Sequence, residues 1–391
     1  MTEVYLSRQP LVNRQSRIIA TRLLLHLAAE GGMPAAVMAL DSLAGVWPTG
    51  GKPLFVSCPA ATIDARLLDW LAPENATIEL PAACLLGEHG PDLIAAIQTW
   101  QPTICLQFDP QATQALSIGL QYRFIGFDAQ SLSNAQLKLL AARTKSYGMG
   151  IAFQVTTTAD FRASMDAGVT AAAGWFFTTP SGIPAKTLSA SQANIMRVLN
   201  LVRNNAEIRE IEAALKQDVA ISYRLLRYIN SAGFGLSCEI QSFRHAVTML
   251  GYDKLNRWLS LLLTTASKDP MAPALMHTAL VRARLMELLA AGLVDKSEYD
   301  NLFITGAFSL LDALLGLGME KILDAMRLPE PISDALLGNG GRYRPFLDLA
   351  LASEAGDGRA IAEQAAMLGL TAAQFNSAQL QALAFADAME F

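Results

Sequence analysis

The stretch ALKQDVAISYRLLRYINSAGFGLSCEIQSFRHAVTMLGYDKL, residues 214–255, decides the fold of the second half of the chain. Its apolar residues recur at helical spacing as far as Ile229. The spacing stops in the segment 230–235, because its two glycines permit the left-handed backbone on which helices commonly end. Ser242 can cap a second amphipathic helix, which Gly251 ends. The stretch therefore predicts three packed helices, and it holds no obvious nucleophile, acid or metal ligand.

The segments DVAISYRLLRYINSAGFG and IQSFRHAVTMLG, taken together, resemble the signature of the HDOD domain, a helical relative of the HD phosphohydrolases. The resemblance covers the order, the spacing and the residue types of the whole stretch. It implies a helical domain, and it directs attention to the positions where HD enzymes carry their metal ligands.

Length and composition predict about two domains. The chain has 391 residues, of which 52% are hydrophobic and 17% are charged, so it can bury large cores. The formal net charge of -5 argues against broad binding to nucleic acid, which depends on clustered lysine and arginine. We therefore expect no nucleic acid partner, although a local basic patch stays open.

Cysteine usage and the absence of targeting signals favour a cytoplasmic protein. The four cysteines lie far apart without a CxxC pair, and we interpret them as reduced thiols in the core. The N-terminal MTEVYLSRQP lacks the basic and apolar regions of a signal peptide. The longest apolar run, 302–319, contains Asp312 and several glycines, which fits a buried helix better than a membrane span.

The N-terminal 180 residues alternate short apolar runs with helical patterns. Strands are predicted at 4–6, 18–25, 54–58, 77–80, 104–108, 124–128, 150–155 and 174–178, with helical segments at 65–71, 91–100, 134–147 and 159–167. This alternation predicts right-handed βαβ units in a parallel sheet, and about eight strands suggest a barrel. An open doubly wound sheet is the alternative, but no glycine-rich loop follows the first strand to hold a dinucleotide.

The segment 178–192, TTPSGIPAKTLSASQ, changes composition abruptly and predicts an exposed linker. Only helical patterns follow it. The one pronounced interruption is the glycine-rich segment 338–342, which ends in Arg342 and precedes Arg344. These arginines could suit a phosphate, but no P-loop lysine and serine follow, so we expect a plain helix-to-helix connection.

The N-terminal region also resembles a known family. The run YLSRQPLVNRQSRIIATRLLL near the start and the run AAAGWFFTTP at the end are similar to the two ends of EAL domains, which hydrolyse cyclic di-GMP. A shortened EAL domain followed by HDOD resembles the EAL-HDOD signalling proteins over nearly the whole chain. This resemblance implies an α/β plus all-α protein: a degenerate, shortened TIM-like (β/α) barrel of EAL type at 1–180, a linker at 181–192 and a helical HDOD domain at 193–391.

The resemblance also shows which EAL metal ligands the chain lacks. The family's ligand positions fall on Arg22, Ser57, Glu79, Gln107, Phe108 and Asp128. Two later motifs, which supply glutamates and a glutamine in the family, read AFQVTT at 152–157 and AGW at 173–175. EAL chemistry uses two divalent cations, which need several carboxylate or amide oxygens. Because Arg22 is a cation in a ligand position, we expect no metal, no cofactor and no catalytic residue; Arg22 pairs with Glu79 or Asp128 in our hypothesis.

The HDOD half also lacks the metal-ligand residues of the HD enzymes to which it is related by resemblance. The HD metal-binding pair falls on Ser309 and Leu310, and His277 lies near an upstream ligand position. One imidazole without partners cannot hold a catalytic metal, so we interpret His277 as a partly buried, hydrogen-bonded residue. The other histidines have no ligand spacing, and no other catalytic motif is present.

The sequence therefore predicts a catalytically inactive regulatory or scaffold protein of bacterial signalling. The family resemblance suggests a pathway of motility, biofilm or cyclic di-GMP output, with other signalling proteins as partners. Binding of cyclic di-GMP is not expected, a homodimer stays open, and no membrane partner is expected. The alternatives are a residual phosphodiesterase that uses Glu79 and Asp128, a non-hydrolytic cyclic di-GMP receptor in which Arg8, Arg14 and Arg22 meet phosphate, and nucleic acid binding by the HDOD arginines.

Overall fold

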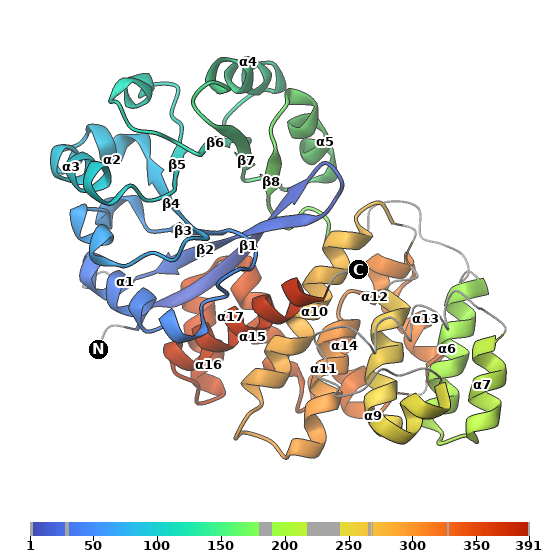
Figure 1. The fold of residues 1–391 in the computed structure, drawn as a ribbon. Coiled ribbons are helices and arrows are strands. Elements are labelled where there is room, and N and C mark those ends of the chain that lie inside the picture. Colours follow the sequence, from blue (N-terminus) through green and yellow to red (C-terminus); the bar gives the residue numbers. More distant parts are fainter. Residues whose placement is uncertain are drawn as a thin grey trace. The chain divides into compact units, whose positions relative to one another are not determined.

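A computed structural model describes residues 3–27, 31–179, 190–216, 243–264, 267, 269–326 and 328–389. The chain divides into two compact units. The barrel unit comprises Met1–Phe177 and Leu351–Gln381, and the helical unit comprises Thr178–Ala350 and Ala382–Phe391. Both are drawn in Figure 1. The domain division predicted from the sequence, with one cut at 181–192, differs from these units in the placement of Leu351–Gln381.

Eight strands close a barrel in the order of the chain, which confirms the predicted TIM-like fold. They are β1 (Tyr5–Asn13), β2 (Ile18–His26), β3 (Leu54–Ser57), β4 (Ala76–Pro81), β5 (Ile104–Gln107), β6 (Phe124–Asp128), β7 (Met149–Phe153) and β8 (Ala171–Ala173). The alternative open sheet is wrong, because β1 pairs with both β2 and β8.

Two details of the strand prediction are also wrong. Strands β2 to β8 run parallel to one another. Strand β1 is antiparallel to both of its neighbours, β2 and β8, because the tight turn closed by Asn13 and Ser16 reverses the chain between β1 and β2. The last strand was expected at 174–178 and is found at Ala171–Ala173, since the backbone of Gly174 (φ 155°) departs from the strand. Figure 1 shows β1 and β2 as a long hairpin.

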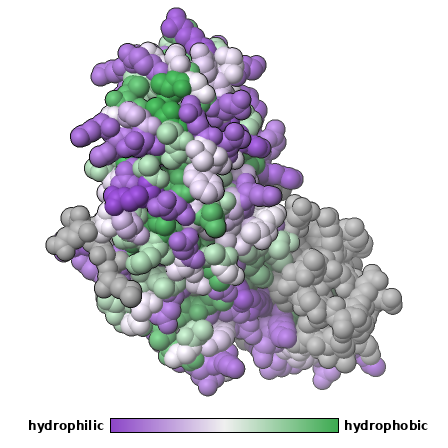
Figure 2. All heavy atoms as spheres, turned by 60° about the vertical axis from the view of Figure 1, so that its left-hand side comes forward, coloured by the Kyte–Doolittle hydropathy of each residue, from purple (hydrophilic) through white to green (hydrophobic). Residues whose placement is uncertain are grey.

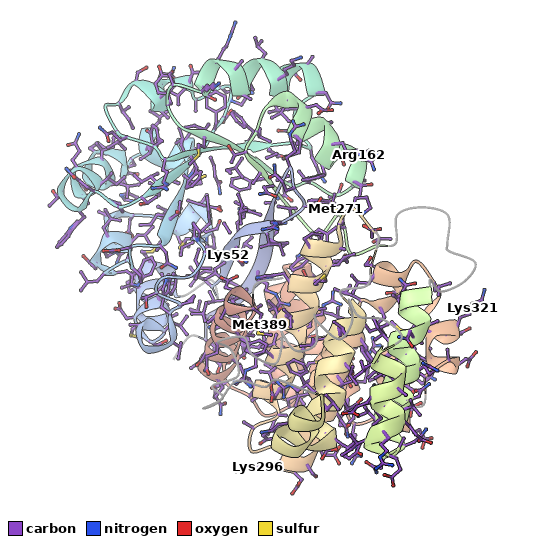
Figure 3. All side chains as sticks on the ribbon, turned by 45° about the vertical axis from the view of Figure 1, so that its right-hand side comes forward. Lys52, Arg162, Met271, Lys296, Lys321 and Met389 are labelled. Atoms are coloured by element: carbon purple, nitrogen blue, oxygen red, sulfur yellow. The ribbon has the colours of Figure 1, made fainter. Side chains whose placement is uncertain are left out.

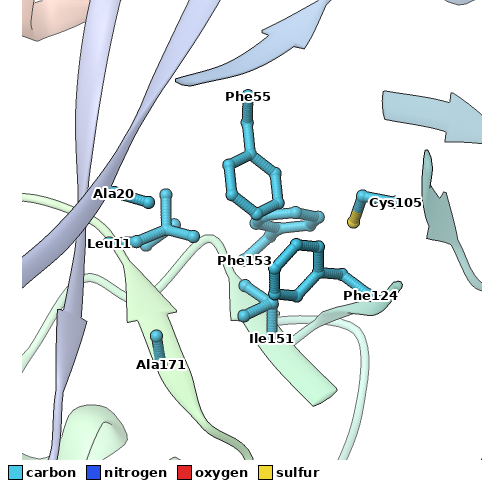
Figure 4. Close-up of a cluster of buried hydrophobic side chains, with 9 residues drawn as sticks. Leu11, Ala20, Phe55, Cys105, Phe124, Ile151, Phe153 and Ala171 are labelled. Atoms are coloured by element: carbon cyan, nitrogen blue, oxygen red, sulfur yellow. The ribbon is translucent and has the colours of Figure 1, made fainter. Parts of the chain in front are cut away.

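Aromatic and small side chains fill the barrel interior. Phe55 and Phe124 lie with ring centroids 4.9 Å apart. Around them gather Leu11, Ala20, Cys105, Ile151, Phe153, Ala171 and Ala173 (Figure 4). These residues come from seven of the eight strands. The interior of the barrel around these residues is therefore a packed core, as is usual for this architecture.

Few and short helices surround the strands, as expected for a shortened barrel. They are α1 (Gly32–Asp41), α2 (Ala82–Leu86), α3 (Gly90–Trp100), α4 (Asn134–Thr144) and α5 (Thr158–Ala167), with a 3-10 helix, η3, at Ala65–Asp69. Local sequence sets their ends: Ser133 and Gln136 form a capping box for α4, and Gly168 ends α5 in the left-handed region. On the face of the molecule that Figure 2 displays, apolar and hydrophilic residues are intermixed.

The segment Leu351–Gln381 completes the barrel unit from the far end of the chain. It holds the end of α15 (Arg344–Ala355), α16 (Gly358–Met367) and the first part of α17 (Ala372–Ala388). The Asn376 side chain accepts from the Leu6 N–H at 3.0 Å and donates to the Val4 carbonyl at 2.7 Å. This side chain satisfies backbone groups at the start of the chain's first strand, which would otherwise be buried without partners.

A buried arginine joins the same two segments. Arg8 on β1 is 2% exposed, and its guanidinium donates to Glu354 at 2.5 Å, to Ser353 at 3.1 Å and to Gln379 at 3.3 Å. Gly358 lies so close to His26 that a Cβ atom there would be 2.4 Å from the His26 Cβ. The barrel unit is therefore discontinuous in sequence.

The helical unit contains the remaining helices of the described residues. They are α6 (Ala190–Arg203), α7 (Ile208–Lys216), α9 (Phe243–Thr264), α10 (Ala272–Leu289), α11 (Tyr299–Phe308), α12 (Leu311–Leu315), α13 (Met319–Asp324), α14 (Glu330–Leu337), the first part of α15 and the last part of α17. Gly251 interrupts α9 with a φ of 77°, where the sequence predicted a helix end. The linker residues 180–189 and the segment 217–242 lie outside the described residues.

The apolar run 302–319 is largely buried, as predicted, but it is divided between α11, α12 and the first residue of α13 and does not form one helix. Among the described residues no helix is both long and apolar enough to cross a bilayer. The glycine-rich segment is the expected helix-to-helix connection, since Gly338 ends α14 in the left-handed region and α15 starts at Arg344. Arg342 and Arg344 contact the carboxylates of Glu298 and Asp348, at 3.2 and 2.7 Å.

Replacing Glu354 by Leu should destabilise the barrel unit. The change removes the carboxylate at 2.5 Å from the buried Arg8 guanidinium, and breaking a buried pair typically costs about 3–5 kcal/mol. We expect the free energy of unfolding, followed by urea denaturation of the whole chain, to fall by that amount. The double variant Arg8→Met/Glu354→Leu should recover most of the loss, whereas equal instability of both variants would contradict the assignment.

The three described cysteines should differ in reactivity. Burial raises the pKa of Cys58 to about 12 and that of Cys105 well above its ordinary value, whereas Cys84 is only half-buried. Because the thiolate is the reactive form, we expect iodoacetamide at mildly alkaline pH to modify Cys84 first in a Cys238→Ser background. Mass spectrometry should find Cys58 and Cys105 modified only after unfolding.

Candidate functional site

The mouth of the barrel is organised around a buried ion pair between Arg22 and Glu79. Arg22 projects from β2 and Glu79 from β4, and they are 5% and 1% exposed. The Arg22 Nε donates to Glu79 Oε1 at 2.6 Å, and Nη2 donates to Oε2 at 2.7 Å. This two-pronged geometry is the strong form of an arginine–carboxylate contact. The predicted pair thus forms with Glu79, and Asp128 is not its partner.

Three further side chains hold this pair in place. Arg22 Nη1 donates to Gln9 Oε1 at 2.8 Å, and Gln107 Nε2 donates to Glu79 Oε2 at 2.8 Å. The Arg22 guanidinium also lies 4.1 Å from the centroid of the Phe153 ring. These contacts use both carboxylate oxygens and all three guanidinium nitrogens, so each of these atoms has a hydrogen-bond partner.

The Phe153 ring occupies space that a side chain on β6 would otherwise take. A Cβ atom added at Gly126 would lie 2.2 Å from that ring. Gly126 stands two residues before Asp128 on the same strand. The glycine and the phenylalanine are therefore coupled, and together they give Arg22 an aromatic surface to lie on.

The electrostatics favour a charged Arg22. Burial opposes the charge of Arg22, but the charge and the hydrogen bonds of Glu79 outweigh it, so the pKa of the guanidinium lies above its ordinary value. Burial raises the pKa of the neighbouring Cys105 thiol well above its usual range. Cys105 is therefore a neutral core group at neutral pH and supplies no nucleophile.

A cavity of about 280 Å³ opens above this pair. Its walls are Arg22, Pro81, Ala82, Ala83, Gln107, Phe108, Asp109, Gly126, Asp128, Phe153 and Gln154. Asp128 is exposed at the end of β6 and accepts from the Gln130 N–H at 2.9 Å. Ser57, at the end of β3, lies beside Glu79 in strand register and does not line the cavity. Of the six predicted positions, the structure joins Arg22, Glu79 and Gln107 directly.

These residues do not fit a pair of divalent cations. Hard cations need several oxygen ligands, and both Glu79 oxygens already accept from Arg22 and Gln107. A cation beside Arg22 would be repelled by a charge that cannot be titrated away. Within the described ranges, no group of three or more His, Cys, Asp or Glu residues could hold a metal ion.

The positions that resemble HD ligands are also engaged in structural contacts. Ser309 lies between α11 and α12, where its hydroxyl accepts from Arg282 at 3.0 Å and donates to the Gly306 carbonyl at 2.7 Å. His277 lies 2.8 Å from Asp387, which fits the predicted hydrogen-bonded histidine. No arrangement for metal chemistry results from these contacts.

Residues 186–314 match the HDOD domain family. The helical unit contains an HDOD domain. The match extends over the segment whose residues first suggested it, and it starts before α6. A closed barrel precedes this match, which agrees with the predicted order of a TIM-like barrel followed by an HDOD domain. The HDOD match covers 129 of the 391 residues, counted from 186 to 314.

Two relatives match larger parts of the chain. The cyclic di-GMP phosphodiesterase CdgJ of Vibrio cholerae is 30% identical over 220 residues, which are 56% of this chain and 51% of that protein. The match thus spans about half the length of CdgJ. The uncharacterized protein YuxH of Bacillus subtilis is 25% identical over 373 residues, which are 88% of this chain and 89% of that protein.

Solved EAL proteins are similar to part of the chain. The FimX EAL domain of Pseudomonas aeruginosa, bound to c-di-GMP, covers 45% of this chain and 89% of its own at 20% identity, with a TM-score of 0.35. BlrP1 of Klebsiella pneumoniae, in a manganese and c-di-GMP complex, covers 44% of this chain and 55% of its own at 16% identity, with a TM-score of 0.38.

Sequence reasoning missed Gln9 and Phe153. Gln9 faces Arg22 directly in the β1–β2 register, so a hairpin alignment of the first two strands could have found it. Phe153 ends β7, and no sequence signal shows that its ring packs under a residue of β2. Its neighbour Gln154 has a φ of 58°, which only the structure shows.

A double-mutant cycle should reveal the Arg22–Glu79 pair. Arg22→Met alone leaves Glu79 buried without its cation and should lower the free energy of unfolding by about 3–5 kcal/mol, measured by urea denaturation. Arg22→Met/Glu79→Leu should be much closer to the parent protein. Additive losses in the cycle would mean that the two side chains do not interact.

Proposed function

We propose that this chain is a catalytically inactive regulatory protein of a bacterial cyclic di-GMP signalling pathway, which acts by binding other proteins in the cytoplasm. The observation that carries the proposal is the buried Arg22–Glu79 pair at the mouth of the barrel. It occupies a carboxylate that would be needed to hold a divalent cation, and metal-assisted hydrolysis of a phosphodiester requires that cation.

The name of the Vibrio relative supports the pathway and argues for the opposite activity. CdgJ is called a cyclic di-GMP phosphodiesterase, and the match reaches about half of it. The residues of this chain favour the inactive reading. Disturbing even an outer partner of a metal ligand typically lowers affinity or activity about 10- to 100-fold, and here an arginine stands among the expected ligands.

The cavity charge argues against tight binding of the dinucleotide. Cyclic di-GMP carries two anionic phosphodiester groups, whereas Asp109 and Asp128 are exposed carboxylates on the cavity wall. Arg22 also lines the cavity, but Glu79 offsets its charge. A non-hydrolytic receptor is the second candidate, because Arg22 is an arginine within reach of a ligand in that cavity.

The barrel unit and the helical unit both offer surfaces to which other proteins can bind. A helical domain offers grooves in which an amphipathic helix of a partner can lie.

A turnover assay with cyclic di-GMP and manganese tests the proposal. We expect no product above the level of the Glu79→Ala variant, because Glu79 holds no metal. Hydrolysis of cyclic di-GMP that Glu79→Ala abolishes would instead establish that the chain is a phosphodiesterase. Equilibrium dialysis with the labelled dinucleotide separates the second candidate: saturable uptake without turnover, lost in Arg22→Met, would establish a receptor.

A further inference from the structure

The helical unit contains an arginine whose two terminal nitrogens are buried. Arg203 is the last residue of α6, and the residue as a whole is half-buried. Its Nε donates to Asn256 Oδ1 on α9 at 2.8 Å. Nη1 and Nη2 are buried, and neither has a hydrogen-bond partner among the residues that the structure describes. The donors of both nitrogens are therefore unmet.

Buried arginines of the barrel unit show the usual arrangement. Arg8 donates from Nη2 to the carboxylate of Glu354. Arg22 donates from Nη2 to the carboxylate of Glu79. At Arg203, by contrast, burial lowers the pKa of the guanidinium to about 10. Because a buried charge without a counter-charge is costly, an anion that reaches Arg203 would stabilise the chain.

Two hydrogen bonds fix the frame around this guanidinium. Helix α6 packs against α9 (Figure 1), and the bond from Arg203 Nε to Asn256 joins them. One turn earlier on α9, the Tyr252 hydroxyl donates at 2.9 Å to the carbonyl of Ala206, which follows α6. The ring centroid of Phe308 lies 5.8 Å from the guanidinium carbon. The charged group is therefore held in place in the absence of a ligand.

Asn256 adds a donor beside the guanidinium. Since its Oδ1 accepts from Arg203 Nε, its other terminal atom is the amide nitrogen Nδ2, which has no hydrogen-bond partner within the described part of the chain. A guanidinium matches the spacing of oxygens in phosphate and carboxylate groups. A tetrahedral oxyanion also offers an oxygen to each of Nη1, Nη2 and Nδ2. We propose that Arg203 and Asn256 form a binding site for a free phosphate-type oxyanion.

A free ion fits this site better than a larger ligand. Because Nη1 and Nη2 are buried, a protein or a nucleic acid lying on the surface would not contact them. The phosphate group of a nucleotide would have to bring its sugar between the helices. Part of the Arg203 side chain borders solvent, which gives a small ion a route to the guanidinium. The site lies in the helical unit and stands apart from the proposed function, which rests on the barrel mouth.

Equilibrium dialysis of the full chain with labelled inorganic phosphate, in chloride buffer of constant ionic strength, tests the site. We expect saturable, stoichiometric uptake. Arg203→Met should weaken it about tenfold or more, because hydrogen bonds to a charged group are lost. The matched controls are Arg209→Met on α7 and Lys321→Met on α13, each of which removes an exposed cation of the same unit. Lys321 is labelled in Figure 3, and neither control should change the uptake.

A second arm supplies the counter-charge from the chain itself. Asn256→Asp places a carboxylate where Arg203 Nε already donates. We expect this variant to melt above the parent in chloride buffer and to take up phosphate about tenfold more weakly or worse. Arg203→Met should melt no lower than the parent in chloride, because it buries no unpaired charge. Phosphate should raise the parent melting temperature more than that of Arg203→Met, and this difference removes the general stabilisation by phosphate.

Several results would overturn the proposal. The parent chain could take up no phosphate, Arg203→Met could take up as much as the parent, or Arg209→Met could reduce uptake equally. Melting of Arg203→Met below the parent in chloride would show that the guanidinium is already paired. Guanosine monophosphate should not displace the ion, and equal displacement would mean that the ligand is a nucleotide phosphate and no free ion. The turnover assay depends on the barrel mouth, so the two proposals fail separately.

Discussion

The mouth of the barrel depends on the need to neutralise one buried arginine. Arg22 is placed by β2 at the centre of the mouth, and its charge cannot be removed by titration. Glu79 meets it at 2.6 and 2.7 Å, Gln9 and Gln107 complete the hydrogen bonds, and the Phe153 ring supports the guanidinium. Truncating either partner leaves a buried charge, so the arrangement holds as a whole.

Polar groups of the helical unit are also engaged in local hydrogen bonds. Ser309 stands where HD enzymes are expected to have a metal ligand, and it contacts Arg282 and the Gly306 carbonyl. His277 lies against Asp387. In both units, side chains at positions that resemble metal ligands, among them Glu79, Gln107 and Ser309, are engaged in local contacts. Such contacts satisfy buried polar atoms and thereby stabilise the fold without requiring an ion.

The sequence predicted the barrel because apolar runs and helical patterns alternate. It predicted a partner for Arg22, either Glu79 or Asp128, because the EAL resemblance places these residues at one site, and the structure selects Glu79. Apolar periodicity carries no strand direction, so the antiparallel β1 was missed. It also does not say which core a helix joins, so the placement of Leu351–Gln381 with the barrel was missed. The contacts of Gln9 and Phe153 with Arg22 were not predicted, because they depend on the register and packing of separate strands.

The central claim is that Arg22 and Glu79 leave no place for a catalytic cation. Calorimetric titration of the full chain with manganese tests it most directly, because it measures the ion without relying on turnover. The account predicts no saturable heat in the micromolar range for the parent chain or for Glu79→Ala. Micromolar, stoichiometric manganese binding that is lost in Glu79→Ala would contradict it.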